Sequence, residues 1–266
     1  MLRTVLLTTE ATHHRFFAWK VHERFPWSGI LLETGQATPS FEVFHLFEAQ
    51  RDAYERDVLL AGSLQTFQAM APCRVFESAN DPASVQWLKV LAPEVIIVFG
   101  TRRLVPNVFR VPSRACLNLH GGDPERYRGL DSQLWAISRG EFGALTTTLH
   151  HVDEGLDTGD IVGQAPLVFH RGHRLHHLRA VNTIACVELT LQALSRLHRG
   201  EPLPARRPAE RGAYYSWMPS ALKAACVEQF ERFIEGRAPD AHPPTSGAEG
   251  AGRRAKKRSG RRALHV

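Results

Sequence analysis

The sequence predicts an α/β fold with a mostly parallel sheet, and three observations lead to this prediction. Short apolar and β-branched runs alternate with longer segments that carry apolar residues at helical spacing. Residues 93–100 (PEVIIVFG) are apolar on both faces, as a strand inside a parallel sheet usually is. The first apolar run, the helical segment after it and the next run form a β-α-β unit. These features are typical of a Rossmann-like domain, and a chain of 266 residues, 43% of them hydrophobic, can bury one such core.

In the N-terminal half, helical segments separate the predicted strands, which are residues 3–9, 30–32, 73–76 and 93–100. Thr12 is the expected N-cap of the first helix. Asp81 is the expected N-cap of a later helix that ends near Leu91, with Pro82 in its first turn. The turn at residues 9–12 contains no glycine, which argues against a dinucleotide phosphate site at this place.

Residues 41–70 are charged and apolar at helical spacing, which predicts a packing helix or a helical hairpin. A lid over a substrate site is the alternative interpretation. The side chains expected to be buried in this segment are Phe44, Leu46, Phe47, Ala53, Tyr54, Val58 and Leu59.

In the C-terminal half, strands are predicted at residues 115–120, 146–152 and 165–169. A long amphipathic helix should follow at residues 173–198, with Gly200 closing it, and a last helix should end near Gly236. We therefore divide the chain into a main domain, a helical C-terminal appendage and a tail, at residues 1–200, 201–236 and 237–266. The tail has almost no large apolar side chain, so we expect it to be disordered.

The net charge of +6 resides in the tail, which carries eight Lys or Arg and two Asp or Glu. The rest of the chain has 25 of each and is electroneutral. Nucleic-acid binders usually carry a basic face on the domain that docks, so nucleic acid is an expected partner only through the tail. A solvated tail without a partner is the alternative. The N-terminal apolar run is too short for a signal peptide and no run reaches membrane-spanning length, so we expect a cytoplasmic protein. A homodimer is compatible with the sequence.

The cysteines and histidines do not predict a metal site. The four cysteines are far apart, lie among apolar neighbours and form no Cys-x-x-Cys pair, so we expect reduced core residues at Cys73, Cys116, Cys186 and Cys226. Four histidines gather at helical spacing, at His170, His173, His176 and His177. Neither a cysteine nor a carboxylate completes a usual zinc set there, so a solvated helix start is expected.

The residues that predict chemistry lie between residues 116 and 164. Asn118 and His120 alternate with apolar residues ahead of two glycines, as on a strand that runs out into a loop, so both should face the same side. The predicted strand at 146–152 ends in a loop at 153–159 that is rich in Asp and Gly. Two predicted strands thus place an amide, an imidazole and a carboxylate at their ends or in the loops that follow them.

This pattern resembles the N10-formyltetrahydrofolate-dependent formyltransferases. The matching motifs are Asn-x-His at 118–120, Tyr-Arg-Gly at 127–129 and Leu-Asp-Thr-Gly at 156–159, and the resemblance covers roughly residues 93–164. It implies a Rossmann-like formyltransferase fold, a formyltransferase catalytic domain at 1–200 and N10-formyltetrahydrofolate as the co-substrate. It also implies a catalytic trio, which falls on Asn118, His120 and Asp157.

The resemblance assigns further residues to the two substrates. The folate slot would be lined by Phe99, Arg102, Leu104, Val152 and Asp153, with a solvated surface arginine as the alternative for Arg102. The acceptor would contact Arg126, Tyr127, Arg128 and His150, the two arginines as phosphate contacts. His150 is equally well interpreted as a half-buried strand histidine. Asp153 and Asp160 are alternatives for the catalytic carboxylate, and Asp157 is preferred because it matches the family loop.

Formyl transfer is acyl transfer between two nitrogens, so the oxyanion that forms needs fixed donors. The Asn118 amide and the His120 ring are donors of the right type. Asp157 would hold His120 in one tautomer and accept the proton of the incoming amine.

Departures from the family restrict the acceptor. Residues 121–124 (GGDP) replace the Ser-Leu-Leu-Pro that methionyl-tRNA formyltransferases share, and residues 202–236 are too short and insufficiently basic for their tRNA-binding domain. The turn without glycine at 9–12 counts against glycinamide ribonucleotide. We therefore expect an amino sugar on a nucleotide. Methionyl-tRNA formylation, and a non-catalytic folate- or nucleotide-binding module, are the alternatives.

Overall fold

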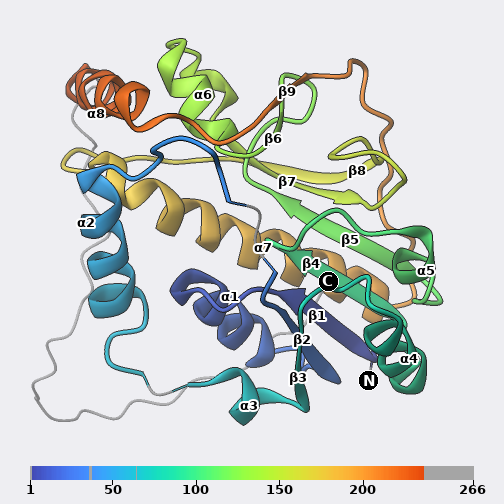
Figure 1. Ribbon diagram of the computed structural model, residues 1–266. Coiled ribbons are helices and arrows are strands. Elements are labelled where there is room, and N and C mark those ends of the chain that lie inside the picture. The colour runs from blue at the N-terminus through green and yellow to red at the C-terminus, as the bar shows by residue number, and fades with distance from the viewer. Residues whose placement is uncertain (1, 36–37, 64, 237–266) are drawn as a thin grey trace, which may run out of the picture.

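The structure, a computed structural model, describes residues 2–35, 38–63 and 65–236 (Figure 1). The predicted disorder of the tail at 237–266 lies outside these described residues. Seven strands form one sheet in the order β3-β2-β1-β4-β5-β7-β8. Their bounds are β1 (Thr4–Thr8), β2 (Gly29–Glu33), β3 (Cys73–Phe76), β4 (Val95–Phe99), β5 (Ala115–His120), β7 (Thr146–His151) and β8 (Ile161–Pro166).

The sheet is mostly parallel, as the sequence predicts. β3, β2, β1, β4 and β5 run parallel to one another, and β7 alone runs antiparallel to both its neighbours, β5 and β8. The prediction for β4 is confirmed, because all five of its side chains are buried. Ile97 belongs to the core on one face of the sheet, whereas Ile96 and Val98 belong to the core on the other face.

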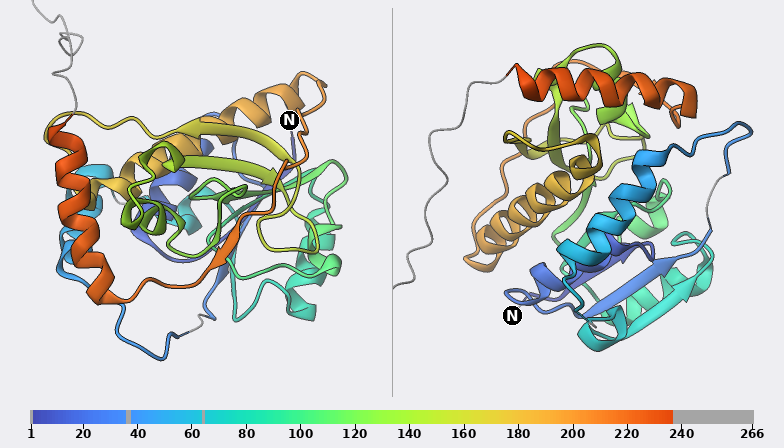
Figure 2. Two further views of the ribbon diagram at one scale, coloured as in Figure 1. Left: turned by 90° about the horizontal axis from the view of Figure 1, so that it is seen from above. Right: turned by 90° about the vertical axis from the view of Figure 1, so that its left-hand side faces the viewer.

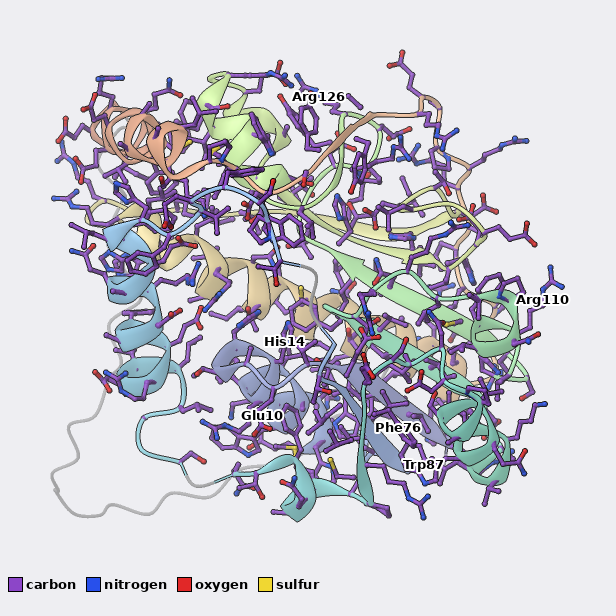
Figure 3. All side chains as sticks on the ribbon, viewed as in Figure 1. Glu10, His14, Phe76, Trp87, Arg110 and Arg126 are labelled. Carbon is purple, nitrogen blue, oxygen red and sulfur yellow. The ribbon has the colours of Figure 1, made fainter. Side chains whose placement is uncertain are left out.

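Helices cover both faces of the sheet (Figure 2). α1 (Thr12–His22) and α7 (Leu178–His198) pack on one face. α4 (Pro82–Leu91) and the short α5 (Pro106–Phe109) pack on the other. On this second face Trp87 of α4 lies beside Phe76 of β3, with ring centroids 6.2 Å apart (Figure 3).

The C-terminal segment is built into the rest of the molecule. α8 (Ser220–Glu235) packs on α6 (Ser132–Ser138) over a separate apolar cluster (Figures 1 and 2). β9 (Ala213–Tyr215) pairs in parallel with β6 (Tyr127–Gly129) to form a second, two-stranded sheet. The appendage, expected to be helical, therefore contributes a strand as well as a helix.

Several predicted details are wrong for identifiable reasons. Ala11, and not Thr12, occupies the N-cap of α1, and no side chain caps that end. The last strand of the sheet begins at Ile161, four residues before the predicted 165, because it is an edge strand. Its position follows from backbone pairing with β7, and its residues include Gly163 and Gln164, which give little apolar signal.

The predicted apolar stripe in residues 41–70 is mostly wrong. The segment breaks into α2 (Leu46–Tyr54), a π-helical turn at Glu55–Leu59 and α3 (Phe67–Met70). Phe47 of the expected stripe is buried, whereas Phe44, Leu46 and Val58 are exposed. Phe44 precedes α2 and Leu46 is the first residue of that helix, whereas Val58 lies within the π turn, where side chains no longer follow the 3.6-residue spacing on which the prediction depends.

Other predictions hold. Asp81 is the N-cap residue of α4, although its side chain accepts a hydrogen bond from Ser78 N and none from the helix. A 3-10 turn at Leu175–His177 leads into α7, and Gly200 follows that helix with a φ of +77°. The four cysteines are free, with Cys73 half-buried and the other three buried. Within the described ranges, no helix combines the length and apolarity that crossing a membrane requires.

Replacing Phe230 by Ala should lower the free energy of unfolding by about 3–5 kcal/mol, because the truncation leaves a cavity in a closed core. Phe230 of α8 is fully buried and packs edge-on against Phe169, with ring centroids 5.0 Å apart. Urea denaturation followed by circular dichroism measures the loss. Leu222→Ala on the exposed side of the same helix is the matched control, with an expected change within about 0.5 kcal/mol. Equal effects of the two substitutions would contradict a structural role for this packing.

Candidate active site

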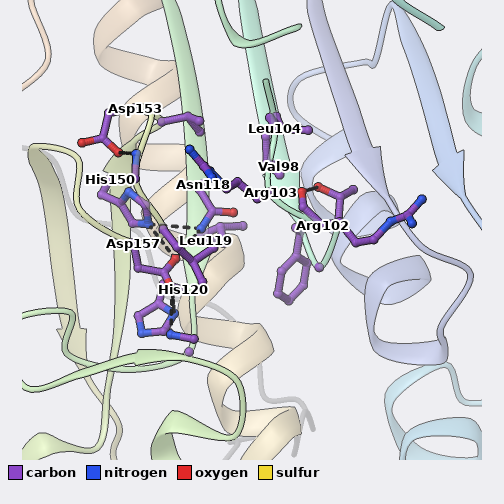
Figure 4. A pocket seen from close by; sticks show the side chains of 18 of the residues that line it. Val98, Arg102, Arg103, Leu104, Asn118, Leu119, His120, His150, Asp153 and Asp157 are labelled. Carbon is purple, nitrogen blue, oxygen red and sulfur yellow. Dashed lines mark hydrogen bonds and ion pairs between the residues drawn. The ribbon is translucent and has the colours of Figure 1, made fainter. Parts of the chain in front are cut away.

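The predicted catalytic side chains come from the carboxyl end of β5 and from the loop after β7. On β5, Asn118 and His120 alternate with buried Leu117 and Leu119. β5 and β7 pair in a register that sets Asn118 opposite His150. The loop at residues 153–159 then brings Asp157 to the same place (Figure 4).

Asp157 is the centre of this arrangement. One carboxylate oxygen, Oδ1, lies 3.3 Å from Asn118 Nδ2 and 3.4 Å from His150 Nε2. The other, Oδ2, lies 3.4 Å from His120 Nδ1 and accepts a 2.9 Å hydrogen bond from the backbone N–H of Gly129. The structure thus brings together the three side chains of the expected trio, and adds His150 and the Gly129 amide to them.

The backbone of the Asp157 loop is unusual. Asp157 has a φ of +51°, in the left-handed region that few residues other than glycine adopt. Two residues later, a side chain at Gly159 would collide with the backbone carbonyl of His151. The Asp-Thr-Gly motif therefore matches a tight turn that presses against the end of β7.

The hydrogen bonds of His150 define how Asn118 is oriented. His150 Nδ1 lies 2.8 Å from the carbonyl oxygen of His151, so this nitrogen carries a proton and donates. In the neutral ring Nε2 then accepts from Asn118 Nδ2, which is 3.1 Å away. Both hydrogens of the Asn118 amide are thus directed at His150 and Asp157. His150, which the sequence left open as an ordinary strand histidine, is part of the cluster.

His120 is held on both sides of its ring. Its Nε2 lies 2.8 Å from the carbonyl oxygen of Tyr127, and its Nδ1 faces Asp157. Because a carbonyl oxygen only accepts, Nε2 carries a proton here. The ring is buried, so its orientation is fixed by these two partners.

The charge of Asp157 follows from its neighbours. Burial alone would raise the pKa of this carboxyl. The facing His120 ring and the Gly129 amide outweigh burial and hold the pKa of Asp157 well below its usual range. The carboxylate is therefore ionised at neutral pH and available as a proton acceptor.

A cavity of about 250 Å³ opens beside these residues (Figure 4). It is lined by the ends of β4, β5 and β7 and by the Asp157 loop, so apolar walls surround a few polar groups, as in most small-molecule sites. All five residues expected to bind folate line it, namely Phe99, Arg102, Leu104, Val152 and Asp153. Asn118, His120, Asp157 and His150 line the same cavity.

Two of the folate-side residues have structural contacts of their own. The backbone N–H of Arg102 donates to Glu33 at 2.7 Å, and its Nη2 donates to the carbonyl oxygen of Glu77 at 2.7 Å. Asp153 accepts from Gly155 N at 3.0 Å and from the Thr158 hydroxyl at 2.6 Å. Arg102 is therefore anchored to the β2 side of the cleft, and Asp153 orders the Asp157 loop.

Unlike the residues expected to bind folate, the residues expected to contact the acceptor do not all line the cavity beside Asp157. Arg126 lies on the outer side of the molecule, where it pairs with Glu141 (Figure 3). The Tyr127 hydroxyl donates to the same carboxylate at 2.5 Å, and neither residue lines the cavity of the catalytic cluster. Arg128 is buried and donates to two backbone carbonyls, those of Leu156 and Gly212.

Sequence reasoning missed a second cavity, of about 220 Å³, which adjoins the first. The two cavities share Gly121, Gly129 and Leu130 as lining residues. The floor of the second is apolar, and Arg51 of α2 and Arg179 of α7 line it as well. No motif indicated these arginines, because they lie on helices far apart in the sequence.

The charges of these two arginines are largely balanced by neighbouring carboxylates. Arg179 donates to both oxygens of the buried Glu55, each at 2.6 Å. Arg51 donates to Glu48 at 3.0 Å and to Asp52 at 2.9 Å. In the described part of the chain, no group of three or more His, Cys, Asp or Glu is arranged to hold a metal ion.

Curated proteins of similar sequence include two methionyl-tRNA formyltransferases. Methionyl-tRNA formyltransferase of Clostridium novyi (strain NT) is 26% identical over 174 residues, which are 65% of this chain and 53% of that protein. The protein of the same name from Synechococcus sp. (strain JA-2-3B'a(2-13)) is 33% identical over 138 residues, which are 51% of this chain and 42% of that protein. The chain thus spans about half the length of the curated relatives it matches.

Two solved structures have a similar fold. A Mycobacterium tuberculosis protein described as a candidate sugar N-formyltransferase has a TM-score of 0.55 and 17% identity, with 81% of this chain and 75% of that chain covered. HypX from Aquifex aeolicus in complex with tetrahydrofolic acid has a TM-score of 0.53 and 17% identity, with 90% of this chain and 35% of that chain covered.

The family model described as Formyl transferase matches residues 32–178. This segment is more than half of the sequence, and it contains each of the described residues that lines the cavity beside Asp157. On this ground the chain belongs to the formyl transferase family.

Proposed function

We propose that the protein transfers a formyl group from N10-formyltetrahydrofolate to the amine of a small acceptor, and that this acceptor is an amino sugar linked to a nucleotide. One observation carries the proposal: a buried, ionised carboxylate contacts an amide and an imidazole on the wall of a cavity of ligand size. Membership of the formyl transferase family, and the tetrahydrofolate complex of the similar Aquifex aeolicus structure, support folate as the formyl donor.

The chemistry needs no covalent intermediate with the enzyme. The acceptor amine adds to the formyl carbon, the carbonyl oxygen becomes an oxyanion, and N10 of the folate leaves as the carbonyl forms again. Asp157, which is ionised at neutral pH, accepts the proton of the amine after the nitrogen has added to the formyl carbon and has become acidic. Asn118 exchanges one of its two internal hydrogen bonds for one to the oxyanion. Asp157 passes the proton that it took from the amine on to the leaving N10, and His120 holds the carboxylate in place.

The two adjoining cavities suit two substrates that meet at the catalytic cluster. Folate would occupy the cavity lined by Phe99 and Leu104, and the acceptor would occupy the second cavity. The guanidinium groups of Arg51 and Arg179 are suited to the phosphates of a nucleotide, because planar N–H donors pair with phosphate oxygens. Their carboxylate partners hold both side chains in place before the ligand binds.

Methionyl-tRNA formylation is the second candidate, because the sequence relatives compared above are methionyl-tRNA formyltransferases. Two sequence features favour the small acceptor. The main part of the chain is electroneutral, whereas tRNA binding usually needs a basic face. Residues 121–124 also depart from the motif of the methionyl-tRNA enzymes.

An acceptor panel tests the proposal. With N10-formyltetrahydrofolate as donor, kcat/KM for a nucleotide-linked amino sugar should exceed that for methionyl-tRNA by at least about 100-fold, because an electroneutral main part of the chain gives the tRNA phosphates little electrostatic attraction. The release of tetrahydrofolate measures turnover, and mass spectrometry of the product identifies the formamide. The same nucleotide sugar with a hydroxyl in place of the amine is the control and should give none. A ratio in favour of methionyl-tRNA would replace the first candidate by the second. Folate binding without turnover of any acceptor would indicate a binding module.

A further inference from the structure

Each residue of β6 contacts His120, Asp157 or the residue before Asp157. The carbonyl oxygen of Tyr127 accepts a hydrogen bond from His120 Nε2 at 2.8 Å. Arg128 Nη1 donates to the carbonyl oxygen of Leu156, the residue before Asp157, at 3.0 Å. The backbone N–H of Gly129 donates to the Asp157 carboxylate at 2.9 Å. The short strand β6 thus holds the ring, the loop and the carboxylate together.

β6 is in turn held by residues 212–215, which we call the strap. Its strand β9 lies parallel to β6, with Tyr127, Arg128 and Gly129 opposite Ala213, Tyr214 and Tyr215. Ala213 N donates to Arg126 O at 3.1 Å, and Leu130 N donates to Tyr215 O at 2.9 Å. The strap lies outside the segment that the family model matches, which ends at residue 178.

Two glycines allow the strap to approach this closely. Gly129 has a φ of +93°, and a side chain there would collide with the carbonyl oxygen of Tyr215. A side chain at Gly212 would lie 2.6 Å from the backbone of Arg126. The backbones of β6 and the strap can therefore lie in close contact.

Arg128 links the strap directly to the Asp157 loop. While Nη1 reaches Leu156, Nε donates to the carbonyl oxygen of Gly212 at 2.7 Å, so one guanidinium spans both segments. The side chain is buried, with 8% of its surface exposed. A buried guanidinium hydrogen-bonded to two carbonyls fixes the distance between them, which a flexible lysine would not do.

We propose that Arg128 is a positioning residue for formyl transfer, and that it makes the strap part of the active site. By tying Leu156 to Gly212, Arg128 holds the left-handed turn at Asp157 in the orientation in which its carboxylate meets His120 and the Gly129 amide. This inference rests on the proposed roles of Asp157 and His120. It differs from the sequence interpretation of Arg128 as a phosphate contact, and the two make opposite predictions for kcat and KM.

Arg128→Ala should lower kcat about 10- to 100-fold, because a misplacement of about 1 Å at a reacting group can cost that much. The KM values for N10-formyltetrahydrofolate and for the acceptor should stay within about twofold of the wild type, because neither substrate loses a contact. Added guanidinium ion should restore part of the kcat of Arg128→Ala. Arg128→Lys, the milder change, should also lose kcat and should not respond to guanidinium. Steady-state kinetics with the acceptor identified by the panel supplies these values.

Arg110→Ala is the matched control. Arg110 is an exposed arginine that pairs with Glu154 of the same loop at 3.1 Å, with both side chains about two-thirds exposed (Figure 3). A surface ion pair of this kind contributes little, so kcat should stay within about twofold. A loss in Arg110→Ala equal to that in Arg128→Ala would mean that any disturbance of the loop is enough, and would overturn the specific role of Arg128.

A second readout does not depend on turnover. Carbon-13 NMR of the Asp157 carboxyl should show its pKa well below the usual range in the wild type and raised in Arg128→Lys, because the loop no longer holds the carboxylate against its donors. If no acceptor is turned over, the proposed function fails while this titration still tests the inference. A raised acceptor KM with unchanged kcat, or an Asp157 titration identical in both proteins, would overturn it.

Discussion

Asp157→Asn should lower kcat by about 10² to 10⁴-fold, the usual contribution of a general base. The substitution keeps the shape of the side chain but removes the charge that accepts the amine proton. It also sets an amide against His120 Nδ1, where the wild type has a carboxylate oxygen at 3.4 Å. Single-turnover measurements with N10-formyltetrahydrofolate and acceptor bound separate this loss in the chemical step from any change in binding.

The control for Asp157→Asn is Asp160→Asn. Asp160 is an exposed carboxylate at the end of the same loop and was one of the sequence alternatives for the catalytic residue. Its replacement should leave kcat within about twofold, as surface substitutions usually do. A large loss in Asp160→Asn with a small loss in Asp157→Asn would exchange the two assignments.

The pH dependence of the stability of Asp157→Asn follows from the direction in which the pKa of Asp157 is shifted. The pKa of Asp157 in the folded protein is held below its usual range by His120 and the Gly129 amide, against the effect of burial. A carboxyl with a depressed folded pKa stabilises the protein above its unfolded pKa of about 3.9, and this stabilisation is lost as the pH falls through the folded value. The stability difference between wild type and Asp157→Asn should therefore be constant near neutral pH and should shrink in acid.

Asn118→Ala should lower kcat by about 10² to 10³-fold, as removal of an oxyanion donor usually does. The loss should be in kcat more than in KM, because the donor is used only when negative charge develops on the formyl oxygen. Rapid-quench measurement of the formyl-transfer step gives the comparison. Truncation also leaves His150 Nε2 and Asp157 Oδ1 without the Asn118 N–H groups that now contact them.

Asn118→Asp is the sharper test of the donor role. Aspartate has the same shape, but it presents acceptors where asparagine presents N–H groups, and it brings a second negative charge close to Asp157. Its activity should be no higher than that of Asn118→Ala. Activity near the wild-type level in Asn118→Asp would mean that no N–H at this position is needed.

The parts of the fold that could be predicted are those in which local sequence and burial agree. β4 is an uninterrupted apolar run because both of its faces are covered, and this pattern identified the centre of the sheet. β8 was misplaced because an edge strand with one covered face needs few apolar side chains, and its position depends on pairing with β7. The π turn after α2 interrupts the regular helix at residues 55–59, which helical spacing cannot anticipate.

The candidate site also has parts that could be predicted from the sequence and parts that could not. The spacing of Asn118 and His120 on one strand, and the Asp-Gly loop after the next, were sufficient to predict that these side chains meet. The partners of Arg126 and Arg128 were not predictable, because Glu141 and Gly212 reach them only through the tertiary fold. The second cavity was missed for the same reason, since Arg51 and Arg179 come together from distant helices.

The pairing of β6 with the strap has a consequence for the order in which the molecule matures. Arg128 and Gly212 are 84 residues apart, so their contact is non-local and its formation has a loop-closure entropy cost. A ribosome must have released residue 212 before the Asp157 turn can be locked. A nascent chain that already displays every family motif would therefore still be catalytically immature, and competence would arise late in folding.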